Sequence, residues 1–232
     1  MSAIIERRLD RRGFIGGLGA VSAVLATRCT TSTSSQPLES KAKNKAASGS
    51  DFSFQEISRG LDETHHIAPG HSADVLIRWG DPLFDDSPSF DPFNQTAEAQ
   101  RRQFGYNNDF IGVIPLSGRR ALLCVNHEYT STNLMLPGVA AAYPDSITRE
   151  HSEVELAAHG GTIVEIEKTG GAWKPVIGSK YNRRITADTT PMEVTGPAAG
   201  HARLTTSDDP TGRLVAGTMN NCAGGITPWG TY

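Results

Sequence analysis

The chain has 232 residues and a net charge of −3, but the charge is divided unevenly. Residues 1–50 hold 8 basic and 3 acidic side chains, a net charge of +5, whereas residues 51–232 hold 14 basic and 22 acidic side chains, a net charge of −8. An acidic body argues against a dedicated nucleic-acid partner, which needs clustered Lys and Arg, and it is compatible with cation binding through carboxylates. The 38% hydrophobic content is ordinary for a globular protein and excludes collagen-like, coiled-coil and wholly disordered chains.

Residues 1–27 have the pattern of an export signal. Arg11 and Arg12 are followed by Phe14 and by a short, Gly-rich, mildly apolar stretch. No apolar run reaches the ~18 residues of a membrane span, so the stretch fits the apolar region of a signal peptide. The paired arginines predict a twin-arginine signal, with the twin-arginine translocase as the partner during export and a periplasmic or secreted location. An ordinary secretory signal that holds two arginines is the alternative.

Residues 28–50 are rich in Ser, Thr, Lys and Ala and nearly free of large apolar side chains. Such a segment buries too little surface to offset the entropy of ordering, so it is predicted to be a disordered linker. Membrane anchoring by an uncleaved signal, or by lipidation of Cys29, is less favoured because Arg28 stands where a small residue is wanted. The folded domain is then expected over residues 51–232.

The body has the pattern of an all-β fold. Short apolar runs are separated by Gly, Pro, Asn and Asp, a spacing typical of a sandwich, a barrel or a propeller. No repeat of 40–50 residues is visible, so the repeats alone do not select the propeller. Helical periodicity is limited to residues 97–104 and 149–158. The expected strands cover residues 75–79, 110–114, 121–126, 162–167, 173–177 and 214–219.

Two polar clusters flank the expected hairpin of residues 110–126. Asn108 and Asp109 precede its first strand, and Glu128 follows its second. The hairpin brings them to the same end or to opposite ends, depending on register. Asn, Asp and Glu oxygens suit Ca²⁺, and Glu also suits iron. The alternative is ordinary turn chemistry, in which Asn and Asp are common.

Residues 220–230 are dense in small residues around Cys222, which leaves room for close approach to a bound group. Cys222 is a candidate thiolate metal ligand, and a disulfide with Cys124 or an inert thiol is the alternative. The seven His show no zinc-protease spacing. Arg184 and Arg203 lie in an otherwise acidic body and are candidate phosphate-binding residues, although most such Arg are solvated surface residues.

Several of these segments resemble one known family. They are FGYNNDFIGVIPL, ALLCVNHEYT, AHGGTIVEIE, NRRITADTTPMEVTGPAAGH and NNCAGGITPWGTY. Together with the twin-arginine start, they are similar to the PhoX-type alkaline phosphatases, most clearly from about residue 105 to residue 232. The resemblance implies a β-propeller and an exported, metal-dependent enzyme that hydrolyses small phosphate esters, a monomer when full length.

The resemblance also implies cofactors and site residues. The family site holds Fe³⁺ and Ca²⁺, with a Cys thiolate among the iron ligands, which favours Cys222 as that ligand. Asn108, Asp109 and Glu128 match family motifs near the metals. The family continues beyond the position of Tyr232, so the chain is expected to be an N-terminal part of the propeller, about its first blades, and inactive alone. An exported propeller-like binding or structural protein without catalysis is the alternative.

Overall fold

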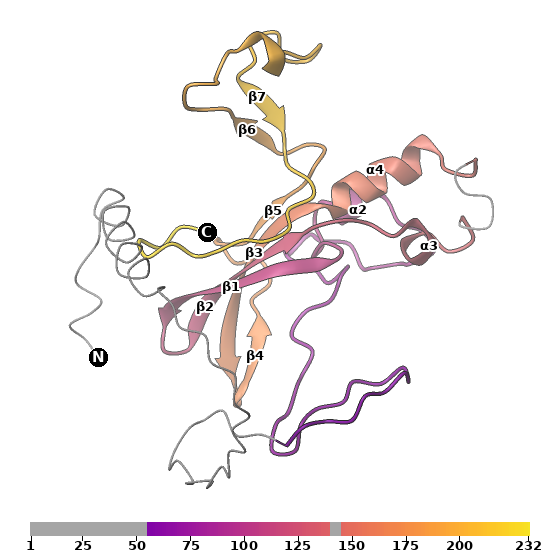
Figure 1. Ribbon diagram of the computed structural model, residues 1–232, viewed down its shortest axis with the longest axis vertical. Coiled ribbons are helices and arrows are strands. Elements are labelled where there is room, and N and C mark those ends of the chain that lie inside the picture. Colours follow the sequence, from indigo (N-terminus) through magenta and orange to yellow (C-terminus); the bar gives the residue numbers. More distant parts are fainter. Residues whose placement is uncertain (1–54, 140–144) are drawn as a thin grey trace, which may run out of the picture. The chain divides into compact units, whose positions relative to one another are not determined.

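The computed structural model describes residues 55–139 and 145–232, which are mostly antiparallel β-structure with few helices (Figure 1). The predicted signal peptide, 1–27, and linker, 28–50, lie outside the described residues. The chain divides into two compact units, residues 1–75 and 76–232. The described part of the first unit, residues 55–75, contains no helix or strand.

The second unit is built on a five-stranded antiparallel sheet. Its order is β1-β2-β3-β4, and β5 also pairs with β3. β4 pairs with residues 166–169 of β3 and β5 with residues 161–163, so both lie on the edge of β3 opposite β2. The strands expected from the sequence at 110–114, 121–126 and 162–167 are confirmed. The bounds are Asn108–Ser117 for β1, Arg120–His127 for β2, Gly160–Thr169 for β3, Ala172–Pro175 for β4 and Arg183–Ile185 for β5.

Helices are short in the described residues. They are α2 (Ala97–Gln100), α3 (Thr132–Met135), α4 (Arg149–Ala158) and the 3₁₀ turn η3 (Ala202–Leu204). α4 confirms the predicted helix over 149–158, and a capping box between Thr148 and His151 fixes its start. The helix predicted over 97–104 ends at Gln100. None of the described helices has the length and hydrophobicity needed to cross a bilayer.

A second, two-stranded sheet pairs β6 (Pro191–Glu193) with β7 (Leu214–Ala216). The sequence predicted a strand over 214–219, but β7 ends at Ala216. Gly217 has φ +84°, a left-handed conformation that ends the extended chain, and its Cα faces the Thr186 carbonyl so closely that a Cβ would clash.

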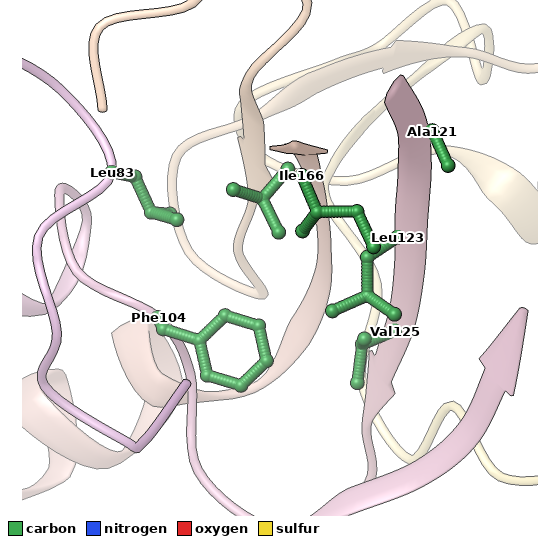
Figure 2. Close-up of a cluster of buried hydrophobic side chains, with 7 residues drawn as sticks. Leu83, Phe104, Ala121, Leu123, Val125 and Ile166 are labelled. Carbon is green, nitrogen blue, oxygen red and sulfur yellow. The ribbon is translucent and has the colours of Figure 1, made fainter. Parts of the chain in front are cut away.

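The core of the second unit lies on one face of β2 and β3. Alternate residues of a strand point to the same face, and Figure 2 shows Leu123 and Val125 of β2 on the side of the strand where Phe104 lies. Burying this face fixes the β2–β3 register, because a shift by one residue would move every core side chain to the opposite face. The core residues are Leu83, Phe104, Ala121, Leu123, Val125, Val164 and Ile166.

The strand predicted over residues 75–79 is wrong: this segment forms no strand. Leu76, Ile77 and Trp79 pack against the buried clusters from a loop instead, and Val75 is exposed. Trp79 packs edge-on against Phe90 and Tyr106, with ring centroids 4.7 and 5.0 Å away, and its indole N–H donates to Gln100 at 2.9 Å. An apolar run signals burial, and here aromatic packing provides the burial without strand pairing.

Candidate metal centre

The β1–β2 hairpin brings the two polar clusters of the sequence to the same end. Asn108 at the start of β1 pairs in register with His127 at the end of β2. Asp109 therefore lies on β1 close to Glu128, which follows β2 directly. Of the two registers left open by the sequence, the structure has the one that gathers the carboxylates.

The segment after β7 returns to this end of the hairpin and adds Cys222. One ligand atom each from Asp109, Glu128 and Cys222 lies within 4.8 Å of the others. Asp109 and Cys222 are exposed, and Glu128 is half-buried, so an ion could reach the group from solvent. Among the described residues this is the only group of three or more His, Cys, Asp or Glu donors this close together.

The side chains of Asp109, Glu128 and Cys222 are all acidic, so their ionised forms repel one another. Hydrogen bonds from the Cys222 thiol to the carboxylates of Glu128 and Asp109 raise the pKa of the thiol. The distance from Cys222 Sγ to Asp109 Oδ2 is 3.5 Å. Carboxylates beside a thiol disfavour the thiolate, whereas a cation placed among the three groups would favour it. The cluster therefore gathers acidic groups whose mutual repulsion a bound cation would relieve.

Two left-handed asparagines hold the main chain of Glu128. Asn107 and Asn220 have φ values of +50° and +56°, which Asn tolerates better than other residues with a Cβ. The Glu128 N–H donates to the Asn107 carbonyl at 3.1 Å, and Asn220 Nδ2 donates to the Glu128 carbonyl at 3.4 Å. Backbone strain of this kind gathers at sites where a side chain must be aimed.

The Cys222 segment is packed against β1 by small residues. An added Cβ on Gly224 would lie 2.7 Å from the Phe110 ring, and one on Gly112 would lie 2.8 Å from Ile226. The neighbouring Asn221 donates to the Gly160 carbonyl at 3.1 Å, which ties the segment to the start of β3. These glycines are needed for close approach, as the density of small residues in the sequence suggested.

The other predicted site residues lie as follows. Asn108 is exposed beside Asp109 at the start of β1. Arg203 is exposed on η3, in the connection between β6 and β7. The guanidinium of Arg184 donates hydrogen bonds to five main-chain carbonyls, which gives it a structural role, and its phosphate-binding role stays a prediction. Burial lowers the pKa of Arg184 to about 9, which still leaves it a cation at neutral pH.

Cys124 and Cys222 are both free thiols, so the disulfide alternative is absent from the structure. Cys124 is 1% exposed on β2, and burial raises the pKa of its thiol. It is a small apolar residue of the sheet, as its sequence context predicted. The two cysteines thus have different environments, one in the sheet and one among carboxylates.

The donor set fits a transition-metal cation. A thiolate with two carboxylates suits iron, because sulfur is a soft ligand and carboxylates stabilise Fe³⁺ by charge. Thiolates are not calcium ligands, so a Ca²⁺ ion would use only the oxygens here. The residues present therefore fit an iron ion at Cys222.

The sequence did not show the roles of Asn126, which bonds the main chain of Cys222, and of Tyr232, which bonds Asn126. Asn126 is nearly buried at 8% exposure, and its amide bonds both the Cys222 carbonyl and the Tyr232 hydroxyl. The only sequence signal was a polar residue in an apolar strand. That signal could not show that residues 96 and 106 positions away are its partners.

Comparisons with known proteins point to one family. The family model described as alkaline phosphatase PhoX matches residues 52–232. The chain is similar to the solved structure of Pseudomonas fluorescens PhoX in complex with vanadate, a transition state analogue, with 40% sequence identity and a TM-score of 0.69. The match covers 76% of this chain and 30% of that chain, so the chain spans less than a third of that relative. A comparison with curated proteins gives no match.

Proposed function

This chain belongs to the PhoX family of alkaline phosphatases, and we propose from that premise that it is part of a metal-dependent enzyme that hydrolyses small phosphate monoesters. The observation that carries the proposal is the meeting of Asp109, Glu128 and Cys222 within 4.8 Å. If this part of the protein bound no metal, nothing would offset the electrostatic cost of placing a thiol between two carboxylates.

In this proposal Cys222, Asp109 and Glu128 hold Fe³⁺, and Asn108 contributes an oxygen ligand to a neighbouring Ca²⁺. When bound, the cations supply positive charge to the phosphate oxygens and to the attacking oxygen. The chain's own part is to supply ligands and to orient them. Without cations, the carboxylates of Asp109 and Glu128 would repel a phosphate dianion, so metal loading precedes substrate binding.

We extend the proposal to fold and location. The two antiparallel sheets form the first blades of a β-propeller, and the 232 residues alone are inactive because they span 30% of the solved relative. The complete protein is a monomer. Arg11, Arg12 and Phe14 direct it through the twin-arginine translocase to the periplasm or the medium. Replacing both arginines with Lys is expected to stop export, and unchanged export through the general secretory route would contradict this part.

The enzyme proposal is tested on the protein isolated from the organism that makes it. Hydrolysis of p-nitrophenyl phosphate should stop when calcium is chelated and return when calcium is restored. Full activity in excess chelator, with calcium shown to be absent, would refute the calcium dependence. A fully metal-loaded protein that binds phosphate esters without hydrolysing them would instead favour the alternative, an exported binding protein.

A further inference from the structure

Asn126 uses both ends of its side-chain amide to join three segments of the fold. It lies on β2, and its Nδ2 donates to the carbonyl of Cys222 at 2.7 Å. Its Oδ1 accepts a hydrogen bond from the Tyr232 hydroxyl. The residue is 8% exposed, so water does not readily replace these bonds. One nearly buried amide thus connects β2, the Cys222 segment and the segment around Tyr232.

The orientation of this amide follows from the chemistry of its partners. A main-chain carbonyl can only accept a hydrogen bond, so the NH₂ group must face Cys222. The oxygen then faces Tyr232, whose hydroxyl must donate. Burial, with a smaller effect from Cys124, raises the pKa of Tyr232 to about 12, which keeps the hydroxyl protonated in alkaline solution. Swapping the two ends of the amide would lose the bond to Cys222.

The Tyr232 ring is itself fixed on β1. It stacks on Phe110 with a centroid distance of 5.9 Å and an interplanar angle of 17°. Phe110 follows Asp109 directly on β1, and Asn126 lies two residues before Glu128 on the chain. The β1–β2 hairpin, which places Asp109 on β1 and Glu128 directly after β2, therefore also carries the contacts that set the position of Cys222.

We propose that Asn126, oriented by Tyr232, is a positioning residue of the metal centre: it fixes the main chain of Cys222 so that the sulfur faces Asp109 and Glu128. The proposal rests on the metal centre proposed above. Groups that orient metal ligands from behind typically change metal affinity by about 10–100-fold when removed. Asn126 bonds the main-chain carbonyl of Cys222, so it acts on the metal centre through Cys222.

The test compares Asn126→Ala with Tyr232→Phe and with a matched control, Asn182→Ala, in the full 232-residue chain. Asn182 is 3% exposed and bonds the carbonyls of Leu83 and Val176 at 2.7 and 2.9 Å, so it is a second buried amide that holds loops. The probe is Co²⁺ alone, whose thiolate charge-transfer absorption reports sulfur ligation as well as affinity. Thermal unfolding of each variant measures stability separately.

We expect Asn126→Ala to weaken Co²⁺ binding by about tenfold or more and to reduce the thiolate absorption. Tyr232→Phe, which keeps the ring stack and loses only the hydroxyl, should shift both in the same direction by less. Asn182→Ala should lose stability and keep the affinity. Unchanged Co²⁺ binding in Asn126→Ala, or an equal loss in Asn182→Ala, would overturn the proposal.

A second readout needs no metal and separates this proposal from the metal centre itself. If the wild-type chain shows no thiolate absorption with Co²⁺, the metal centre fails, and alkylation of Cys222 in the metal-free chain decides the positioning role. A sulfur released from Asp109 and Glu128 should react faster with a neutral reagent in Asn126→Ala than in the wild type or Asn182→Ala. Equal rates in all three chains would contradict the positioning role.

Discussion

Replacing Arg184 with Met should destabilise the fold rather than remove a phosphate contact. The Arg184 guanidinium donates to the carbonyls of Gln103, Ala157, His159, Gly161 and Ile185, at distances of 2.5–3.2 Å. These carbonyls come from the turn after α2, from the end of α4 and from β3 and β5. One side chain thus supplies hydrogen bonds to main-chain carbonyls of four neighbouring elements.

The size of the effect follows from two opposing contributions. Five hydrogen bonds from a charged donor, at about 1.5–3 kcal/mol each, would sum to as much as the whole stability of a typical domain. Removing Arg184 also removes the cost of burying its charge, and water can reach some of the carbonyls. We therefore expect a net loss of about 3–5 kcal/mol, because each buried carbonyl left without a donor costs about 1–3 kcal/mol.

The assay is thermal and urea unfolding of Arg184→Met beside Arg203→Met. For a unit of this size, about 3–5 kcal/mol corresponds to a fall in the melting temperature of roughly 6–20 °C. Arg203 is exposed, so its substitution should change stability by less than about 0.5 kcal/mol. An Arg184→Met chain as stable as the Arg203→Met chain, with weaker phosphate binding, would refute the structural role and restore the phosphate-binding prediction.

Three further predictions follow from single sites. Cys222→Ser should lose iron, whereas Cys124→Ser should keep it. Cys124→Ser should lower the free energy of unfolding by about 1–3 kcal/mol, because it buries a hydroxyl without a partner. Measuring iron per chain and the urea midpoint of each variant distinguishes the two effects. Gly160→Ala should lower the free energy of unfolding by about 1–3 kcal/mol or more, because Gly160 has φ +99° and an added Cβ would clash with the main chain of β5. Gly118 has open space around it, so Gly118→Ala should leave the urea midpoint unchanged. Hydrogen bonds lower the pKa of Asp209 from 3.8 to about 2. The ionised carboxylate therefore stabilises the fold above pH 3.8, and this stabilisation is lost as the pH falls toward 2. The difference in unfolding free energy between wild type and Asp209→Asn should vanish over that range. A Cys222→Ser chain that keeps its iron, an unaffected Gly160→Ala chain or an Asp209→Asn difference independent of pH would each contradict its prediction.

Local patterns were sufficient for the central strands and for α4. The runs at 110–114 and 121–126 are bounded by turn residues, and α4 has a capping residue at its start, so each element is encoded by its own residues. The run at 75–79 has the same composition but packs through Trp79 from a loop. Composition reports burial, and only the tertiary partners decide whether burial occurs in a strand.

The candidate site was predictable in its residue types but not in its arrangement. Chemistry and resemblance single out Asp109, Glu128 and Cys222, but the hairpin register brings the two carboxylates together and the segment after β7 adds Cys222. Arg184 is a candidate phosphate-binding residue from its charge alone, and no local signal shows that its guanidinium bonds five main-chain carbonyls. Asn126 was missed because its role depends on partners about a hundred residues away.

The central claim is that Cys222, Asp109 and Glu128 together bind iron. X-ray absorption at the iron edge of the Fe³⁺-loaded chain tests it directly, because scattering from a sulfur neighbour differs from that of oxygen. We expect one sulfur neighbour with the remainder oxygen in the wild type, and the loss of that sulfur in Cys222→Ser but not in Cys124→Ser. Iron surrounded only by oxygen or nitrogen in the wild-type chain would contradict it.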